Sequence, residues 1–550
     1  METLSEKEGK RMCDAAGAKV INRGYCGKCS RVVPVERVQR GNNLYLVREC
    51  PKCGRGETLI SRDAQRYFQK RDLCGYAGEA RATCSLNCMQ CRHGVAPTLV
   101  VIDVTNRCNM NCPICLANIP AMGFEFHPPI EYFDKIFRYL AAITPRPRIQ
   151  LFGGEPTCRD DLIDILVMAK RYGLQARVVT NGLRLANEDY CKRMLATGPQ
   201  LLFGLDGLNP EVQKRLRKNP GSLEKKLQAI ENIEKHTKSK ITLMVTTGVG
   251  VSEYLMDDLM RFCHEKRKLI TLVMLIPLQA AAGPEQVDIE TSTMEDVENM
   301  MGKCFPGLEF VPMGSLRLLK NLQTLYNLKI TMGGAHPNCE SLALMVADEN
   351  AYRPVADYLK MPFTAFIRDL IAWDKAIGPK LERGILGRLF GLNGKKFHMG
   401  LSLFRWSLRH VRIGKVIGPH PVRNLLRTLW GKIRTGKSFS KLWRQNVGGR
   451  NILQIAVLPY EEPGCLESAR LVDCPVAFAC EQPETGDVML VPFCSYFVFK
   501  NDILRKSVER WSKAATVTEK EAPGIAGVDQ GGTPLVAAVG AECLATDQGA

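Results

Sequence analysis

Short apolar runs alternate with longer amphipathic segments through the middle of the chain. The apolar runs, which have the length of buried strands, cover residues 100–104, 149–152, 176–180, 201–205, 241–247 and 269–276. Segments with apolar residues at helical spacing cover residues 160–172, 223–236 and 253–266. Strands and helices in alternation predict an α/β fold with a parallel sheet and right-handed crossovers.

Three cysteines follow the first of these strands, in the sequence DVTNRCNMNCPIC. Cys108, Cys112 and Cys115 have the spacing C-x3-C-x2-C, which supplies three thiolates. A [4Fe–4S] cluster usually takes one cysteine per iron, so three cysteines leave one iron open to a small chelating ligand. A zinc site more often has two C-x2-C pairs or a mixture of cysteine and histidine. The spacing therefore favours an open iron–sulfur cluster.

A second motif, Gly153-Gly154-Glu155-Pro156, follows the apolar run at 149–152. Glycines allow a backbone to approach a ligand closely, because they carry no Cβ. Together with the cysteine triad, this motif resembles the radical S-adenosylmethionine (SAM) superfamily over roughly residues 98–335. The resemblance implies a partial (β/α)6 barrel in which the open iron binds the methionyl end of SAM. It also implies that the glycine backbone and Glu155 hold the SAM amino group.

The same resemblance assigns three further residues to SAM. Ile114 matches the apolar position that packs on the adenine, and Asp206 and Asn181 are placed near the ribose and carboxylate. Both polar residues precede a glycine. Asn-Gly and Asp-Gly are common turn formers, so a purely local turn role is the alternative for each.

Two C-x2-C pairs lie upstream of this core. Cys26 and Cys29 form the first pair, and Cys50 and Cys53 form the second. Four thiolates with this spacing are typical of one tetrahedral metal ion. We therefore predict a mononuclear site for zinc or for a rubredoxin-type iron, and the sequence does not separate the two metals.

Another group repeats the spacing of the SAM triad. Cys84, Cys88 and Cys91 have the pattern C-x3-C-x2-C, and Cys74 precedes them. Four thiolates would complete a cluster with no open iron, suited to electron relay or to packing a linker. Because no GGEP motif follows this group directly, SAM is assigned to the later triad.

A last cysteine group lies toward the C-terminus. The chain has 22 cysteines in 550 residues and no charged, apolar export signal at its start, so metal ligands are expected in preference to disulfides. We predict an auxiliary [4Fe–4S] cluster drawn from Cys339, Cys474, Cys480 and Cys494. Buried free thiols, which pack as small hydrophobic groups, are the alternative.

Several motifs together resemble one branch of the superfamily. They are the two C-x2-C pairs, the two cysteine triads, the run GGEPTCRDDL and a late VPFCSY. That branch contains the archaeal tetraether lipid synthases and pterin-methylating enzymes. The resemblance implies a radical enzyme that joins hydrocarbon tails of membrane lipids, with electrons from a donor such as ferredoxin or flavodoxin. Radical methylation of a pterin or other small molecule is the alternative, because the shared motifs specify SAM and not the substrate.

A basic segment supports a lipid substrate independently of this resemblance. Residues 380–450 contain 17 Lys or Arg and one acid, Glu382, in a chain of net charge +18. Leu, Phe and Trp residues are interleaved at near-helical spacing, which is typical of helices on an anionic membrane. We expect a cytoplasmic protein attached peripherally to the inner face of the membrane. Nucleic-acid binding and a helical pair with no binding role are the alternatives.

These features divide the chain into successive regions. They are a mobile N-terminus (1–20), a cysteine-rich metal-binding domain (21–97), the radical SAM core (98–335), a helical connection (336–375), the basic amphipathic segment (376–450), an auxiliary-cluster domain (451–512) and a disordered tail (513–550). The longest apolar run, around 269–278, is too short to span a bilayer.

Overall fold

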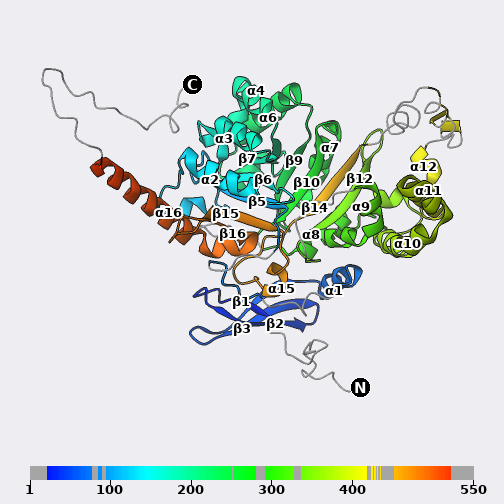
Figure 1. Ribbon diagram of the computed structural model, residues 1–550, viewed down its shortest axis with the longest axis horizontal. Helices are drawn as coiled ribbons and strands as arrows, with labels where there is room; N and C mark the ends of the chain where they lie inside the picture. The colour runs from blue at the N-terminus through cyan, green and yellow to red at the C-terminus, as the bar shows by residue number, and fades with distance from the viewer. Residues whose placement is uncertain are drawn as a thin grey trace.

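The computed structural model describes residues 22–76, 84–89, 95–250, 252–279, 291–327, 336–417 and 451–521, with isolated positions at 423, 424, 427, 428, 430 and 434. The N-terminal segment predicted to be mobile, and Cys91, lie outside the described residues. A small antiparallel domain lies below a central sheet with covering helices, while α10–α12 and α16 extend to opposite sides (Figure 1).

The N-terminal domain is a four-stranded antiparallel sheet with one helix. Its strands, in the order β1-β2-β3-β4, are β1 (Arg23–Tyr25), β2 (Val32–Arg40), β3 (Asn43–Cys50) and β4 (Gly54–Ser61), followed by α1 (Ala64–Leu73). Buried and exposed residues alternate at the start of β2, as expected for a sheet with one solvated face. The tight turns after β1 and between β3 and β4 carry the cysteine pairs.

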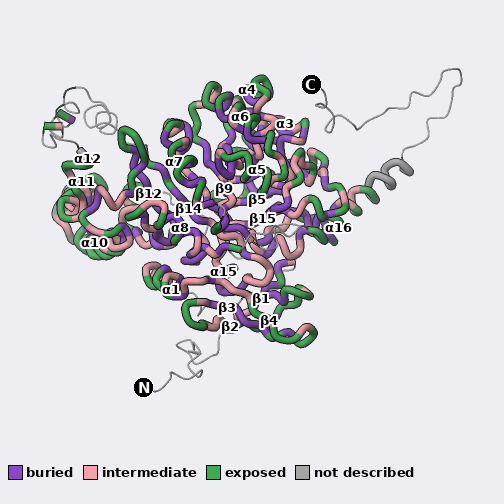
Figure 2. Tube along the Cα trace, turned by 180° about the vertical axis from the view of Figure 1, so that it is seen from behind, coloured by how far each residue is buried: buried purple, intermediate pink, exposed green. Residues whose placement is uncertain are grey.

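Six neighbouring parallel strands form the core of the molecule. They are β5 (Leu99–Thr105), β6 (Arg148–Gly153), β7 (Ala176–Thr180), β8 (Gln200–Gly204), β9 (Ile241–Thr247) and β10 (Ile270–Pro277). The helices between and after them are α2 (Ile130–Ala141), α3 (Leu162–Arg171), α4 (Glu188–Ala196), α5 (Pro210–Arg217), α6 (Ser222–His236), α7 (Met256–Glu265) and α8 (Met294–Cys304). The strands are buried for most of their length (Figure 2).

The predicted α/β class and parallel sheet are confirmed, and the predicted strands agree with the observed ones to within a residue or two. Helix α2 was not predicted, although Phe133, Ile136, Phe137 and Leu140 give it an apolar face. It lies between β5 and β6, after the long loop that carries the cysteine triad.

Segments from the C-terminal third complete both edges of the sheet. On one side β14 (Ile452–Val457) pairs in parallel with β10, and β12 (Ser341–Ala347) pairs antiparallel with β14. On the other side β15 (Val476–Glu481) pairs in parallel with β5 and antiparallel with β16 (Val488–Pro492). Two short strands, β11 (Val311–Pro312) and β13 (Tyr352–Pro354), flank β12. Residues 451–492 therefore share one sheet with the predicted radical core.

The remaining helices lie outside this sheet. The α-helices are α9 (Lys320–Tyr326), α10 (Phe363–Arg383), α11 (Ile385–His410), α12 (Ile413–Ile417), α15 (Ser468–Leu471) and α16 (Phe493–Glu521). Short 3-10 turns are η2 (Ile119–Ala121), η3 (Pro156–Cys158), η4 (Leu183–Ala186), η5 (Glu253–Leu255), η6 (Met313–Leu318) and η7 (Val355–Tyr358). Helix α16 continues past residue 513, where the sequence predicts a disordered tail, and residues after Glu521 lie outside the described part. Among the described residues, no helix combines the length and apolarity needed to cross a bilayer.

A buried ion-pair cluster joins the N-terminal domain to the central unit. Lys70 of α1 is fully buried and pairs with Glu295 and Glu298 of α8, with 3.1 Å between Lys70 Nζ and Glu298 Oε1. Arg66 donates to Glu298 over 2.9 Å. Because buried charges are tolerated when paired, this cluster fixes the orientation of α1 against α8.

Candidate active site

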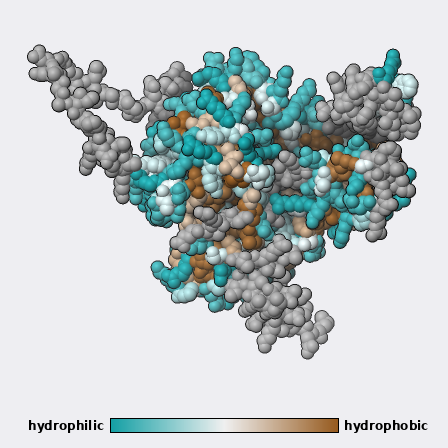
Figure 3. Space-filling model, in the orientation of Figure 1, coloured by the Kyte–Doolittle hydropathy of each residue, from teal (hydrophilic) through white to brown (hydrophobic). Residues whose placement is uncertain are grey.

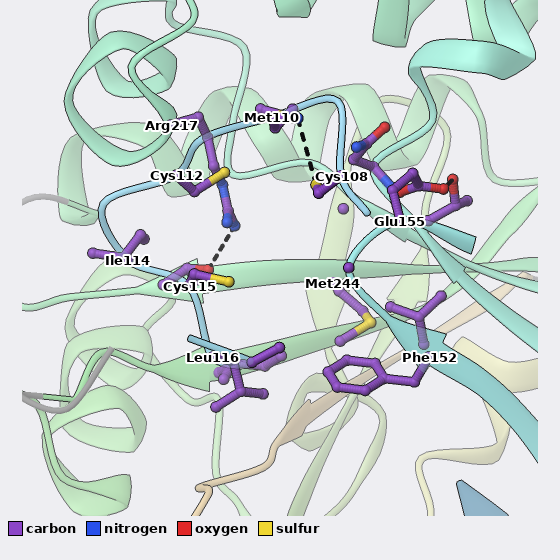
Figure 4. Close-up of a pocket in the computed structure, with 18 of the residues that line it drawn as sticks. Cys108, Met110, Cys112, Ile114, Cys115, Leu116, Phe152, Glu155, Arg217 and Met244 are labelled. Carbon is purple, nitrogen blue, oxygen red and sulfur yellow. Dashed lines mark hydrogen bonds between the residues drawn. The ribbon is translucent and has the colours of Figure 1, made fainter. Parts of the chain in front are cut away.

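The cysteine triad lies on the loop that follows β5, at the carboxyl ends of the parallel strands. Cys108, Cys112 and Cys115 all line one cavity, together with residues from the ends of β6 to β10 (Figure 4). The backbone N–H of Met110 donates to Cys108 Sγ over 3.4 Å. Burial, and then the neighbouring Glu155, raise the pKa of the Cys108 thiol, so an uncompensated thiolate would be costly here. A bound cation such as cluster iron supplies that compensation.

The Gly-Gly pair joins the end of β6 to the root of the cysteine loop. Gly154 N–H donates to Thr105 O over 2.7 Å, and Glu155 N–H donates to Arg107 O over 2.9 Å. A Cβ on Gly153 would lie 2.3 Å from Thr105 O, and one on Gly154 would lie 2.3 Å from Arg107 O. The close approach that demands glycine is therefore to the chain's own backbone, and it sets where the cysteine loop begins.

Glu155 is engaged by the protein itself. Its Oε1 accepts from Thr157 N–H (3.1 Å) and from the hydroxyls of Thr157 and Thr180 (2.7 Å each), and its Oε2 accepts from Asn181 N–H (2.7 Å). Burial raises the pKa of this carboxyl, and the four donors oppose that rise. Glu155 lines the cavity, but most of its hydrogen-bonding capacity holds the loops after β6 and β7 in place.

Asp206 lies behind the cavity wall and holds an arginine. Arg217 forms a bidentate pair with it (2.7 and 2.8 Å), and Thr246 N–H donates to the same carboxylate over 2.9 Å. Burial favours the protonated form, but Arg217 outweighs it and lowers the pKa of Asp206 to about 2. Arg217 itself lines the cavity beside Cys112, where its charge counteracts the burial that raises the pKa of this thiol. The residue that reaches the cavity is thus Arg217, which the sequence analysis did not identify.

Lys226 is a second cation that the sequence analysis missed. It lies on the buried face of α6 at 1% exposure and lines the same cavity. Within the described part of the chain its ammonium group forms no hydrogen bond or ion pair, and burial lowers its pKa to about 8. The detectable signal was a lysine on the apolar face of an amphipathic helix. A buried, unpaired ammonium is suited to an anionic ligand group.

Asn181 and Ile114 also line the cavity, as expected for residues that contact SAM. The Asn181 side-chain amide donates to Asn109 Oδ1 on the cysteine loop over 2.7 Å, and its Oδ1 accepts from Leu183 N–H over 3.0 Å. Asn181 therefore combines the predicted turn role with a position at the cavity. Ile114 packs with Leu216 and Leu278 in a small apolar cluster that offers a surface for a flat ring.

Arg177 lies in the interior of the barrel below this cavity, with Arg148 and Glu340 as its charged neighbours. Phe152 and Val179 line the cavity, and residues two apart on a strand share a face, so Gln150 and Arg177 face the interior about 6–7 Å further down. Among the described residues Arg177 Nε is buried with no hydrogen-bond partner. Burial and then the charge of Arg148 lower the pKa of Arg177 to about 10. The sequence signal was a charge at an inward position of an otherwise apolar strand.

The N-terminal cysteine pairs form a compact metal-binding group. The sulfur atoms of Cys26, Cys29, Cys50 and Cys53 lie within 4.8 Å of one another. Backbone N–H groups of Lys28 and Cys29 lower the pKa of Cys26 to about 6, which favours the thiolate that a metal requires. Four cysteines in this arrangement fit zinc and iron alike.

The second triad lies near the N-terminal domain. Cys84 and Cys88 are beside Tyr25, whose hydroxyl lies 3.6 Å from Cys88 Sγ. Cys74 is placed differently: it caps α1, near Lys70 and Arg317. Cys91 lies outside the described residues, so the predicted ligand set of this group stays a prediction.

Three of the four late cysteines come together. Cys339 and Cys474 are close enough to Cys494 for their charges to raise its pKa, in addition to burial and the neighbouring Glu461. Cys494 in turn lies next to Tyr460, a residue of the cavity wall. This group is therefore adjacent to the SAM-triad cavity.

Cys480 does not belong to that group, and this corrects the ligand set predicted from the sequence. It is buried on β15 in the main hydrophobic core, where Asp103 and then Glu481 are the charged neighbours that raise its pKa in addition to burial. The β15–β16 hairpin pairs Cys480 with Met489, so it does not bring Cys480 and Cys494 together. Its role is that of a small core side chain.

Two family models match parts of the chain. Residues 102–263 match the model of the radical SAM superfamily, and residues 23–62 match the HMPTM N-terminal zinc ribbon domain. The three thiols around one cavity and the Gly-Gly junction fit the [4Fe–4S] cluster and SAM that this class uses. Residues 102–263 of the chain therefore form a radical SAM domain.

The chain is also similar to several named proteins. The chain is 24% identical to 7,8-dihydro-6-hydroxymethylpterin dimethyltransferase of Methanocaldococcus jannaschii, over 88% of this chain and 94% of the relative. It is 29% identical to GTP 3′,8-cyclase of Nautilia profundicola, over 34% of this chain and 59% of that relative. Among solved structures, SuiB of Streptococcus suis bound to S-adenosylmethionine is 14% identical, with a TM-score of 0.31 and coverage of 49% of this chain and 68% of SuiB.

Proposed function

We propose that this radical SAM enzyme methylates an unactivated carbon of a polar heterocycle of the reduced-pterin class. The observation that carries the proposal is Arg177, which faces the barrel interior below the SAM cavity and whose buried Nε has no hydrogen-bond partner among the described residues. A guanidinium donates two parallel hydrogen bonds to neighbouring oxygen and nitrogen acceptors, as a pterin ring presents them. The relative from Methanocaldococcus jannaschii, aligned over nearly its whole length, acts on such a substrate according to its name.

Cys108, Cys112 and Cys115 would hold the cluster, which with bound SAM would supply a 5′-deoxyadenosyl radical able to remove a hydrogen atom from an inert C–H bond; a separate one-carbon donor would supply the methyl group. The protein's own residues position the reactants. Lys226 and Arg217 are the cations available to the SAM carboxylate, and Ile114 offers the apolar surface for the adenine. Asp206 holds Arg217 in place, and Glu155 holds the loops after β6 and β7 that border the cavity.

Arg177 also distinguishes the two substrate classes that the sequence left open. A hydrocarbon tail filling the barrel interior would leave the buried Arg177 Nε without a hydrogen-bond acceptor, and an unsatisfied buried donor is costly. The neighbouring Glu340 favours the charged form of Arg177 and so keeps this donor in place. A polar ring with acceptors removes that cost. This is why the pterin-like substrate is favoured over joining of lipid tails as the principal reaction.

The experiment is anaerobic reconstitution with iron, sulfide, SAM and a reductant, followed by assay of 5′-deoxyadenosine. We expect a reduced hydroxymethylpterin to stimulate deoxyadenosine formation, and to gain methyl groups when a one-carbon donor is supplied, while diether lipid gives no stimulation. Arg177→Gln should abolish the stimulation by pterin but retain slow substrate-independent SAM cleavage. Arg193→Gln, at an exposed arginine of α4, is the matched control. Stimulation by lipid alone would contradict the proposal.

A second candidate is carbon–carbon joining of lipid tails, favoured by the cavity lining and the late cysteines. Phe152, Met244, Ile276 and Leu278 make much of the cavity wall apolar. The group of Cys339, Cys474 and Cys494 lies beside the wall residue Tyr460, where a sulfide of an auxiliary cluster could hold a first substrate radical. Formation of coupled lipid at an unchanged rate by a Cys474→Ser/Cys494→Ser variant would eliminate that role.

A further inference from the structure

Helix α11 carries apolar side chains on its solvent-exposed face. Gly391 has a positive φ of 53° and separates the first turns of α11 from a long amphipathic part. In that part Phe397 is 64% exposed, and the other members of the stripe are exposed to 39–44%; they are Leu401, Phe404 and Leu408. Their spacing of four, three and four residues keeps them within an arc of about 60° over a length of about 16 Å.

The opposite face of α11 packs against α10. Met399 is fully buried with Ile377 and Leu381 of α10. Trp406 contacts Phe366 and Trp373 of α10, with ring centroids 5.0 and 6.2 Å away. Helix α11 therefore packs on α10 with one apolar face, and the exposed stripe is a second apolar face that does not contact α10. Water-exposed apolar surface of this extent is uncommon on a soluble protein unless something covers it.

Positive charge borders the stripe. Arg405 and Arg409 are exposed on its flank, and Arg412 and Lys415 continue the basic edge into α12. Glu382 is the one acid of residues 380–450, and it pairs with Lys395 over 2.8 Å. Helices α11 and α12 therefore contain no acid, and Asp369 of α10 lies 3.4 Å from His410 of α11. Apolar side chains beside exposed arginines on one helix are the arrangement of an interfacial helix on an anionic lipid surface.

The place of α11 in the molecule makes contact with a flat surface feasible. Helices α10, α11 and α12 lie together at one side, beyond the edge of the central sheet and away from the N-terminal domain (Figure 1). On this side, hydrophobic side chains interrupt the hydrophilic surface (Figure 3). A planar bilayer could meet these helices without displacing the sheet.

We propose that the exposed face of α11, formed by Phe397, Leu401, Phe404 and Leu408 with Arg405 and Arg409, is a docking surface for an anionic lipid bilayer. The phenylalanines and leucines insert at the headgroup boundary, and the arginines pair with lipid phosphates. The inference does not depend on the substrate proposed above. A nucleic acid would bind the arginines but leave the leucine and phenylalanine stripe without a partner. An anionic lipid surface accounts for both the arginines and the apolar stripe.

The test is co-sedimentation of the reconstituted full chain with vesicles. We expect binding to equal parts phosphatidylglycerol and phosphatidylcholine to be at least tenfold tighter than binding to phosphatidylcholine alone. Raising the salt from roughly 0.1 to 0.5 M should weaken this binding, because screening reduces the attraction of the arginines for the surface. Equal binding to both kinds of vesicle, or none, would overturn the proposal.

Two variants separate the apolar and the charged contributions. Phe397→Ser/Phe404→Ser and Arg405→Glu/Arg409→Glu should each weaken binding to the anionic vesicles at least fivefold. Matched controls are Tyr254→Ser, an exposed aromatic residue elsewhere, and Lys192→Glu/Arg193→Glu on the exposed face of α4. The controls should bind within twofold of the wild type, and all variants should keep its thermal unfolding midpoint and its substrate-independent SAM cleavage.

Two other occupants of the stripe would give different results. If α11 mediates contact between two copies, the wild type will elute as a dimer and Phe397→Ser/Phe404→Ser as a monomer, with no gain in vesicle binding over neutral lipid. If the surface binds nucleic acid, the arginine variant will lose a salt-dependent RNA shift while the phenylalanine variant keeps it, and vesicles will not compete. Either result overturns the lipid assignment.

Discussion

At the scale of single residues, the acids of the site accept hydrogen bonds from the protein, while two of its cations form no hydrogen bond or ion pair with the described residues. Glu155 accepts four hydrogen bonds from the chain, and Asp206 is held by Arg217 and Thr246. Lys226 and Arg177 have no comparable partners among the described residues. A buried cation without a hydrogen-bond or ion-pair partner in the protein is a candidate for contact with a bound ligand.

Lys226→Met should weaken SAM binding at least tenfold, equivalent to about 1.4 kcal/mol, because it removes the buried ammonium available to the SAM carboxylate. The same change should raise the free energy of unfolding of the SAM-free protein, since it removes an unpaired buried charge. Equilibrium dialysis and thermal unfolding measure the two effects. Lys225→Met, one residue away on the exposed face of α6, is the control. Unchanged SAM affinity would exclude Lys226 from the binding site.

Asp206→Asn should lower kcat/KM for SAM cleavage by about ten- to a hundredfold, because Arg217 loses its bidentate partner. With the pKa of Asp206 lowered to about 2, the ion pair is charged at every working pH. The ratio between wild type and variant should therefore be constant from about pH 6 to pH 9. The stability that the pair contributes, about 2–3 kcal/mol, is present above the unfolded pKa near 4 and is lost as the pH falls toward 2. A ratio that changes across neutral pH would show that another group titrates.

At the scale of elements, the site depends on junctions between segments that are distant in sequence. The loop after β6 is joined by backbone hydrogen bonds to the loop after β5, so the GGEP and cysteine motifs are one structural unit. The C-terminal strand β14 pairs with β10 at one edge of the six-stranded core, and β15 pairs with β5 at the other edge. Helix α1 fastens the zinc-ribbon domain to α8 through buried charges.

Lys70→Met should therefore loosen the N-terminal domain from the central unit. The change leaves Glu295 without a cation and Glu298 with Arg66 alone, and loss of one partner of a buried pair costs about 3–5 kcal/mol. Urea unfolding of the purified protein measures the change, and Lys52→Met at an exposed position should alter stability by less than about 0.5 kcal/mol. A loss below about 1 kcal/mol would mean that the cluster does not fasten the two domains.

At the scale of the whole molecule, the cysteines define three places along one protein. A compact four-cysteine group occupies the N-terminal domain, the SAM triad opens onto the barrel cavity, and Cys339, Cys474 and Cys494 lie next to the cavity wall. Cys84 and Cys494 pack against one apolar cluster, so the second triad and the late group are neighbours.

Cys474→Ser/Cys494→Ser should lower the iron content by roughly four atoms per chain, because it removes ligands of the expected auxiliary cluster. Substrate-independent SAM cleavage should persist, since Cys108, Cys112 and Cys115 are untouched. Iron analysis and the deoxyadenosine assay measure the two effects after anaerobic reconstitution. Cys304→Ser, outside all three groups, should leave the iron content unchanged. An unchanged iron content in the double variant would show that the late cysteines are free thiols.

The sequence by itself determined the α/β class, the SAM triad, the Gly-Gly junction and the four-cysteine knuckle. Each of these features is a local pattern. A hydrophobic period, or thiols a few residues apart, can be recognised in the sequence because the residues involved are close together along the chain. The tertiary structure decided what depends on contacts across hundreds of residues. It removed Cys480 from the late group, replaced Asp206 by Arg217 at the cavity, and brought Lys226 and Arg177 to the site. Those roles follow from which faces of strands and helices meet, and that is decided by packing.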